Sequence, residues 1–175
     1  MFKNPEQVLD QFVIGEGRTV ADLGAGNGAY ALSLARRVGG NGKVYAIDIQ
    51  KDLLERLKNQ AGRARIHNID IVWGDIEKVG GTRLKDETVD AVLVVNVLFQ
   101  AEDKVGLAHE AHRILKKGGR ALLVDWKEQH SGLGPSQTHI VSSDEGRKIF
   151  ENVGFVHERD LSAGDYHYGI VFRKT

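Results

Sequence analysis

The chain has 175 residues, a length typical of a single domain that buries a core of its own. Lys and Arg together number 24, as do Asp and Glu, so the formal net charge is zero and gives no long-range attraction to nucleic acid or anionic membrane. The sequence contains no cysteine, which excludes disulfides, thiol nucleophiles and cysteine-ligated zinc.

The predicted elements alternate between helices and short apolar strands. Asn4 and Pro5 predict the cap and first turn of an N-terminal helix that buries Val8, Leu9 and Phe12. Seven strands are expected, at residues 19–24, 43–48, 69–74, 89–96, 120–126, 155–161 and 167–173. Apolar residues at helical spacing predict helices around 31–38, 54–61, 107–115 and 146–153. This alternation indicates an α/β fold with one doubly wound, mostly parallel sheet.

Two local patterns refine this prediction. The last two strands are separated only by residues 162–166, so they should form an antiparallel hairpin at the end of the sheet. Gly118 and Gly119 follow two lysines and predict the C-cap of the helix around 107–115, with the lysines near the negative end of its dipole. Residues 89–98 are nearly all apolar, as expected of a central strand covered on both faces.

The segment V-A-D-L-G-A-G-N-G, residues 20–28, carries the most information about function. An apolar run leads to glycines at alternate positions (Gly24, Gly26 and Gly28), which is typical of the strand, turn and helix start of a nucleoside-binding crevice. Glycine permits unusual dihedrals and lets a ligand lie against bare backbone. Asp48 comes twenty residues later, at the end of the next strand, where a carboxylate can accept hydrogen bonds from both ribose hydroxyls. We therefore expect an adenosine-containing cofactor.

Asp22 distinguishes between two classes of such cofactor. A dinucleotide brings a pyrophosphate, which a carboxylate two residues before Gly24 would repel. S-adenosylmethionine instead brings a cationic amine and a sulfonium, which Asp22 would attract. The spacing G-x-G-x-G also differs from the dinucleotide pattern G-x-G-x-x-G, although Ala29 offers a small residue at its last position. The glycines alone leave both cofactors open, and Asp22 favours S-adenosylmethionine.

Five motifs in this order resemble the class I S-adenosylmethionine-dependent methyltransferases, and are similar to the small enzymes of the ubiquinone/menaquinone-biosynthesis type. They are the loop at 20–28, Asp48, Gly74-Asp75-Ile76, the apolar strand that ends at Asn96, and the run 114–119 before the fifth strand. The resemblance covers almost the whole chain. It implies a Rossmann-like, doubly wound seven-stranded sheet of order 3-2-1-4-5-7-6 with strand 7 antiparallel, and methyl transfer from S-adenosyl-L-methionine.

The resemblance also implies a set of cofactor-binding residues at the carboxyl ends of strands. These are Asp22, Gly24, Ala25, Gly26 and Gly28 in the first loop, Asp48 and Ile49 after the second strand, Asp75 and Ile76 after the third, and Asn96 and Val97 after the fourth. The glycines would line the methionine portion, with Asp22 acting on its amine. The acids after the second and third strands would hold ribose and the adenine amino group, and the carbonyls after the fourth would bind the amine.

Simpler structural roles remain open for several of these residues. Asp48 and Asp75 could cap a helix or a turn, and Asn96 could be a turn residue. Tyr30, near the start of the first internal helix, suits packing better than a cofactor contact. His109 and His112 lie three apart on one helix, but no third ligand follows at a known spacing, so we expect no metal site.

The sequence defines the binding site of the methyl acceptor less well than that of the cofactor. Methyl transfer is an in-line displacement, for which near-attack positioning supplies most of the help, and a base is needed only if the acceptor loses a proton. His130, His139 and His167 are the candidate bases near neutral pH, and no one of them is preferred. The segments expected to border the acceptor are the N-terminal helix, Leu98, Phe99 and Gln100 after the fourth strand, and Asp125 and Trp126 at the end of the fifth. The loop at 132–139 and the final hairpin at 166–167 are further possibilities. The 18 residues before the first strand predict a small or open pocket, or one completed by a partner chain.

A small-molecule acceptor is therefore expected for a single domain over residues 1–175. No membrane span or signal peptide is apparent, so the expected location is cytoplasmic. The strand ending at Asn96 lacks the Pro-Pro motif of DNA amino-methyltransferases, while an RNA or protein acceptor and the oligomeric state stay open. One alternative is a non-catalytic S-adenosylmethionine-binding subunit. A second is an NAD(P)-dependent oxidoreductase of the short-chain type, which is disfavoured because no tyrosine has a lysine four residues later.

Overall fold

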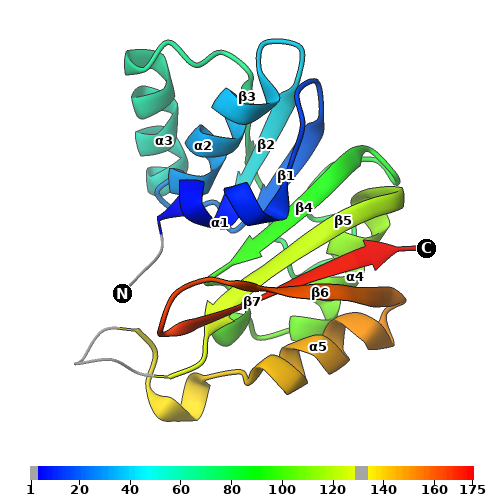
Figure 1. Cartoon of the computed structure of the whole chain (residues 1–175). Coiled ribbons are helices and arrows are strands. Elements are labelled where there is room, and N and C mark those ends of the chain that lie inside the picture. Colours follow the sequence, from blue (N-terminus) through cyan, green and yellow to red (C-terminus); the bar gives the residue numbers. More distant parts are fainter. Residues whose placement is uncertain (1–3, 129–133) are drawn as a thin grey trace.

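The computed structural model describes residues 4–128 and 134–175, which form a single seven-stranded sheet with helices on both faces (Figure 1). The strands are β1 (Thr19–Leu23), β2 (Lys43–Asp48), β3 (Ile69–Trp73), β4 (Val89–Val95), β5 (Leu115–Trp126), β6 (Phe155–Ser162) and β7 (His167–Lys174). The helices are α1 (Pro5–Phe12), α2 (Ala29–Val38), α3 (Lys51–Arg63), α4 (Lys104–Ile114) and α5 (Ser143–Asn152), with 3₁₀ turns η1 (Leu98–Gln100) and η2 (Gln137–His139).

The strand order is β3-β2-β1-β4-β5-β7-β6, as the family resemblance predicts. Strands β1 to β5 are parallel to one another, whereas β7 is antiparallel to both β5 and β6. The predicted terminal hairpin is therefore confirmed. Because β1 lies between β2 and β4, the chain reverses its winding direction there, and the carboxyl ends of β1 to β4 share one edge of the sheet.

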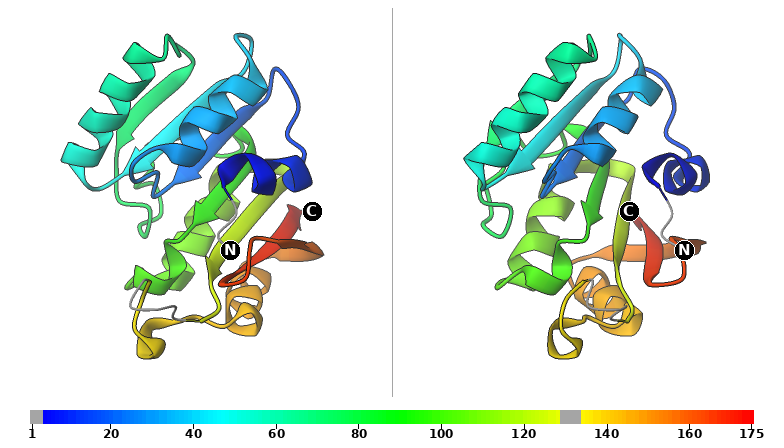
Figure 2. Two further views of the ribbon diagram at one scale, coloured as in Figure 1. Left: turned by 60° about the vertical axis from the view of Figure 1, so that its left-hand side comes forward. Right: turned by 90° about the vertical axis from the view of Figure 1, so that its left-hand side faces the viewer.

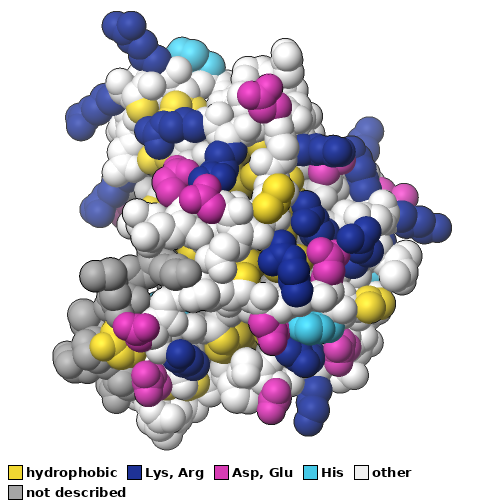
Figure 3. Space-filling model, in the orientation of Figure 1, with side chains coloured by type: hydrophobic (Ala, Val, Ile, Leu, Met, Phe, Trp, Pro, Cys, Tyr) yellow, Lys and Arg dark blue, Asp and Glu magenta, His cyan; other side chains and the backbone are white. Residues whose placement is uncertain are grey.

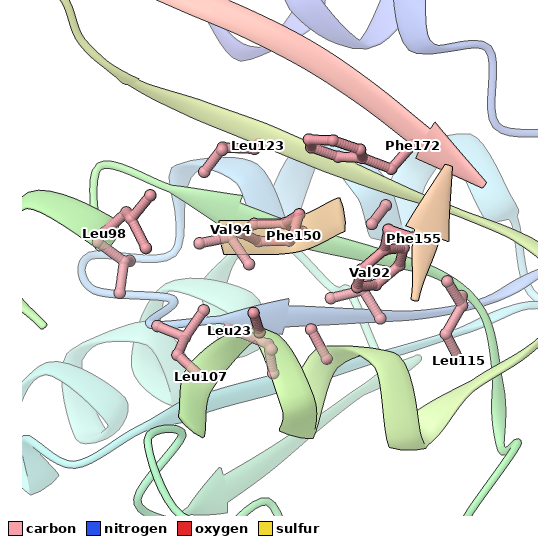
Figure 4. Close-up of a cluster of buried hydrophobic side chains, with 14 of the residues drawn as sticks. Leu23, Val92, Val94, Leu98, Leu107, Leu115, Leu123, Phe150, Phe155 and Phe172 are labelled. Atoms are coloured by element: carbon pink, nitrogen blue, oxygen red, sulfur yellow. The ribbon is translucent and has the colours of Figure 1, made fainter. Parts of the chain in front are cut away.

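Each face of the sheet has its own hydrophobic core. Helices α1, α2 and α3 lie over one face of the sheet (Figure 2). The core between them and the sheet contains residues such as Phe12, Leu34 and Leu57. The other lies under α4 and α5, where Leu107 and Phe150 point towards the sheet (Figure 4). These side chains are fully buried, and burying one of them contributes roughly 1.5–3 kcal/mol. The central strand β4 contacts both cores, which explains its continuous apolar run.

The N-terminal helix begins as the sequence predicts. Asn4 accepts a hydrogen bond of 3.0 Å from the backbone amide of Gln7, and Pro5 follows in the first turn. On its outer side, α1 is tied to α2 because Arg37 pairs with both Glu6 and Asp10 at 2.6 Å. None of the helices in the described part of the chain is long and apolar enough to span a membrane.

The predicted C-cap at Gly118 and Gly119 is wrong. Helix α4 already ends at Ile114, because Leu115 adopts an extended conformation and pairs with Val89 of β4. The next regular pair is Ala91 with Arg120, so residues 116–119 bulge out of β5 opposite a single residue of β4. Gly118 has φ 75° within this bulge, a left-handed conformation that favours glycine.

Candidate functional site

A cleft of about 590 Å³ lies at the carboxyl ends of β1 to β4. It is lined by ten of the eleven residues predicted to bind a cofactor, namely Asp22, Gly24, Ala25, Gly26, Asp48, Ile49, Asp75, Ile76, Asn96 and Val97. These residues come from four different loops, which the parallel strands bring to one edge of the sheet. The volume falls in the range of small-molecule and cofactor sites.

Gly28 is the one predicted residue that does not line the cleft. It is the N-cap of α2 with φ 79°, and a Cβ there would clash with the side chain of Leu57 from α3. The absence of a side chain at this position therefore serves the packing of two helices. This role could not be predicted from the residues around Gly28, because the contact is with Leu57, which is 29 positions later in the sequence.

The glycine loop is held in place by backbone and carboxylate contacts. The amides of Gly24 and Ala25 donate to the carbonyl of Ile47 at 2.8 and 3.0 Å, and the amide of Gly26 donates to Asp48 Oδ2 at 2.8 Å. Gly24 and Gly26 have φ of 74° and 54°. A Cβ on Gly24 would lie 2.5 Å from Cγ2 of Val97, so the loops after β1 and β4 meet at this glycine.

Asp48 therefore has a structural partner on each side-chain oxygen. Oδ2 accepts from the amide of Gly26, and Oδ1 accepts from the amide of Gln50 at 2.8 Å. A carboxylate has about four lone-pair positions, so both oxygens can accept further hydrogen bonds from a ligand. Asp48 therefore lines the cleft and is not the N-cap of α3, which is Gln50; its contact with the Gln50 amide fixes the turn that leads into this helix.

Asp22 is the acid of the cleft whose pKa is most strongly shifted. Burial, and then repulsion from the neighbouring Asp48, raise the pKa of Asp22 to about 7. Its side chain is almost completely inaccessible, and Oδ2 has no hydrogen-bond partner among the described residues. The amide of Ala31 opposes the rise in pKa, but a buried carboxylate oxygen without a partner is costly, and a cationic ligand would relieve that cost.

A second orphaned acceptor lies on the neighbouring strand end. Asn96 follows β4 with φ 55°, a left-handed conformation that asparagine tolerates, and its Oδ1 is buried without a partner in the described structure. Strands β1 and β4 are adjacent, so Asn96 and Asp22 flank the same end of the cleft. Two buried acceptors without donors fit a donor-rich cation such as an ammonium group.

The other end of the cleft combines apolar and acidic groups. Ile49, Leu53 and Ile76 supply apolar surface of the kind that packs on a purine ring. Asp75 follows β3, and Lys78, whose ammonium lies 3.0 Å away, holds the pKa of Asp75 below its usual range. Asp75 also accepts from the amide of Glu77 at 3.1 Å, so it caps this turn as well.

A buried acid of α4 fixes the segment that follows β3. Glu110 is fully buried and accepts hydrogen bonds from the amides of Gly80 and Thr82 at 2.7 and 3.0 Å. The guanidinium of Arg113 donates to both carboxylate oxygens of Glu110 at 2.8 Å. The turn that carries Asp75 is therefore anchored without any contact between Glu110 and the cleft.

All the charged side chains that line the cleft among the described residues are acidic. Asp22, Asp48, Asp75 and Glu77 line it, whereas no Lys or Arg of the described residues does. A pyrophosphate would meet four carboxylates and no basic partner. The cleft therefore fits a neutral or cationic ligand far better than a dinucleotide.

Sequence reasoning missed some of the lining residues. Tyr30, assigned to packing, lines the cleft, and burial together with Asp22 raises its pKa, so its hydroxyl stays protonated at neutral pH. The position of Tyr30, two residues after the last glycine, was the available signal. Pro5 of the N-terminal helix also lines the cleft, and this helix was among the segments expected to border the pocket. Gln100, expected to border the acceptor, does line it, whereas Asp125 does not.

Neither of the two candidate bases that the structure describes, His139 and His167, lines the cleft. His139 lies in η2, where its Nδ1 is 2.6 Å from the hydroxyl of Ser136. His167 lines a separate cavity of about 260 Å³, with its ring centroid 4.3 Å from that of Trp126, and burial lowers its pKa. His130 lies outside the described residues. Among the described residues no group of three or more His, Cys, Asp or Glu side chains could hold a metal ion.

Comparison with known proteins gives a consistent result. A family model described as "Methyltransferase domain" matches residues 14–154. A 2-phytyl-1,4-naphtoquinone methyltransferase of Nostoc punctiforme is 34% identical over 110 residues, which cover 63% of this chain and 47% of that protein. A ubiquinone/menaquinone biosynthesis C-methyltransferase of Escherichia coli is 30% identical over 124 residues, or 69% of this chain and 47% of that protein. The match thus spans about half the length of these two relatives.

The fold is also shared with solved structures. The crystal structure of a SAM-dependent methyltransferase from Aquifex aeolicus superposes with a TM-score of 0.89 at 29% identity. The superposition covers 99% of this chain and 90% of that one.

Proposed function

The chain belongs to the S-adenosylmethionine-dependent methyltransferase family, and from this premise we propose that it transfers a methyl group from S-adenosyl-L-methionine to a small-molecule acceptor. The observation that carries the proposal is the pair of buried acceptors Asp22 Oδ2 and Asn96 Oδ1, which have no partner in the described structure and lie in a cleft without basic residues. An amino acid ammonium group and a sulfonium match this arrangement, and a phosphate does not.

Each wall of the cleft has a role in this proposal. Asp22 and Asn96 bind the ammonium group, and the bare backbone of Gly24 and Gly26 admits the methionine chain. Asp48 binds the ribose hydroxyls with the lone pairs that its backbone contacts leave free. Asp75 binds the adenine amino group, and the apolar residues beside it pack on the ring.

The chemistry relies on placement. When bound, S-adenosylmethionine supplies an electrophilic methyl group on a sulfonium, and the chain orients it for in-line attack by the acceptor. No histidine of the described residues lines the cleft; its polar groups near neutral pH are carboxylates, amides and the protonated Tyr30 hydroxyl. This favours acceptors whose nucleophile needs little help from a base. The acidic lining disfavours acceptors that carry phosphate or carboxylate groups close to the reacting atom.

The names of the relatives suggest the kind of acceptor. Two are described as acting on a naphthoquinone or in ubiquinone/menaquinone biosynthesis, which favours a small aromatic acceptor here. The visible surface supports a small molecule over a nucleic acid, because Lys and Arg are interspersed with Asp and Glu on it (Figure 3).

Calorimetric titration tests the proposal directly. We expect S-adenosylhomocysteine to bind and NAD to bind much more weakly, because the pyrophosphate meets the carboxylates of the cleft. A preference for NAD would overturn the proposal. A screen of phenols, quinols, amines and carboxylates with labelled S-adenosylmethionine then identifies the acceptor. Cofactor binding without turnover on any acceptor would support the non-catalytic subunit instead.

A further inference from the structure

Asp125 is a buried carboxylate that does not line the cleft. It lies near the end of β5, is fully inaccessible, and accepts a hydrogen bond of 2.7 Å from the amide of Trp126 on Oδ1. Its other oxygen, Oδ2, accepts from the amide of Phe99 at 3.2 Å. Since an ionised group is costly to bury unless it is hydrogen-bonded, the contact to Phe99 matters for the state of Asp125.

Phe99 lies in the middle of η1, the turn that continues from β4 into one wall of the cleft. Gln100, the next residue, donates from its amide to the carbonyl of Val97 and from its side chain to the carbonyl of Asn96, both at 3.1 Å. Fixing the amide of Phe99 therefore fixes a short hydrogen-bonded unit that includes Asn96 and Val97.

Asn96, Val97 and Gln100 are the members of this unit that line the cleft. Asn96 carries the orphaned Oδ1, and Val97 lies against Gly24 at the start of the glycine loop. A shift of η1 would therefore move Asn96 Oδ1, which is proposed to accept a hydrogen bond from the ammonium group, and also Val97, which supports the glycine loop.

We propose that Asp125 is a positioning residue for cofactor binding, whose ionised carboxylate holds η1 and thereby places Asn96 and Val97 in the cleft wall. The inference rests on the proposed function, because it concerns affinity for the same cofactor. By thermodynamic reciprocity, if the ionised form binds cofactor more tightly than the protonated form, bound cofactor must favour ionisation to the same degree.

The surroundings of Asp125 place its titration in an accessible range. Burial raises the pKa of Asp125 to about 6, against the opposing effect of the amides of Trp126, Phe99, Leu98 and Val97. Its register partner on β7 is Tyr168, whose pKa is raised by burial, by Asp125 and by Glu145 of α5, so that this phenol stays neutral. Tyr168 and Glu145 are the ionisable groups of the described neighbouring elements that act on this pair.

The first test uses the wild-type protein. The amide proton resonance of Phe99, followed by NMR from about pH 4.5 to 8, reports the ionisation of the carboxylate that it contacts. Without ligand its midpoint should lie near the pKa of Asp125, and saturation with S-adenosylhomocysteine should lower it by about one pH unit, equivalent to tenfold in affinity. Equal midpoints with and without ligand would overturn the positioning role. If wild-type protein does not bind S-adenosylhomocysteine in the calorimeter, the proposed function fails instead.

The second test compares two matched variants. Asp125→Asn removes the charge and should weaken S-adenosylhomocysteine binding about tenfold. Asp90→Asn is the control, because Asp90 of β4 also accepts a backbone hydrogen bond, of 2.8 Å from Thr19, but near the amino end of its strand, away from the cleft. The control should lose some thermal stability and keep its affinity within about twofold. Equal affinities of the two folded variants would contradict the proposal.

Discussion

The carboxylate of Asp48 accepts a hydrogen bond of 2.8 Å from the amide of Gly26, and so joins the end of β2 to the glycine loop after β1. The residue proposed to bind the ribose therefore also shapes the surface on which the methionine portion lies. Loss of this side chain should affect both halves of the ligand.

Replacement of Asp48 by Ala should weaken S-adenosylhomocysteine binding by more than about tenfold, since hydrogen bonds to charged groups contribute roughly 1.5–3 kcal/mol. Asp48→Asn keeps an oxygen for the Gly26 amide and should lose less affinity. Asp52→Ala, an acid in the first turn of α3 that does not line the cleft, is the control. Calorimetry measures all three, and an unchanged affinity in Asp48→Ala would remove Asp48 from the ribose site.

The affinity for S-adenosylhomocysteine should rise with pH through about 7, because Asp22 attracts the ammonium group only when ionised. We expect a clearly lower Kd at pH 8 than at pH 6 for the wild type. In Asp22→Asn the affinity should be lower, and its change over this interval smaller. A wild-type affinity that does not change between these pH values would contradict the assignment of Asp22 to the amine.

The same raised pKa affects the stability of the unliganded protein. The pKa of Asp22 is about 7 when folded and 3.8 as an ordinary side chain, so between these values the folded state binds more protons. The contribution of Asp22 to stability is therefore full below pH 3.8 and is lost as pH rises through 7. Relative to Asp22→Asn, the wild type should lose Tm between about pH 5 and pH 8. If the Tm of the wild type and of Asp22→Asn changed with pH in the same way, the pKa of Asp22 would not be raised in the folded protein.

Gly28→Ala should destabilise the fold by about 2 kcal/mol or more, since the residue has φ 79° and the new Cβ would clash with buried Leu57. Gly62→Ala is a matched control: Gly62 lies inside α3, and a Cβ there would meet no atom within 4 Å. That substitution should leave stability unchanged or raise it by about 0.5–1 kcal/mol. Urea denaturation compares the two, and equal effects would contradict the packing role of Gly28.

Val13→Gly should stabilise the protein by about 1 kcal/mol. Val13 is the C-cap of α1 with φ 58° and ψ 75°, a conformation that is strained for a β-branched residue and free of strain for glycine. Its side chain is 61% exposed, so little packing is lost. We expect Tm to rise by about 2–4 °C. Val156→Gly, in the edge strand β6 and similarly exposed at 50%, should lower Tm and serves as the control.

The sequence predicted the sheet well because short apolar runs and turn residues are local signals. The strand at 43–48 was predicted with the bounds that β2 has, and the terminal hairpin followed from a short connection. The end of α4 could not be found in this way. Two lysines and two glycines resemble a C-cap, but pairing of Leu115 with Val89 extends the chain before they are reached.

The cleft residues that directly follow a strand could be predicted from the sequence. Ten of the predicted residues line the cleft because parallel strands deliver their following loops to one edge. The role of Gly28 depends on Leu57, a long-range contact that has no local sequence pattern. The histidines were proposed because their segments were expected to border the pocket, but His139 and His167 do not line the cleft.

Glu110 and Asp125 brace opposite sides of the cleft without lining it, one through the segment after β3 and the other through η1. Because the two supports share no hydrogen bond with each other, the adenine side of the cleft and the side that binds the ammonium group can be altered separately. Substitutions confined to η1 should therefore weaken binding of S-adenosylhomocysteine, while adenosine, which has no amino acid portion, still protects the protein against thermal unfolding. If these variants were no longer protected by adenosine, the two sides of the cleft would depend on each other structurally.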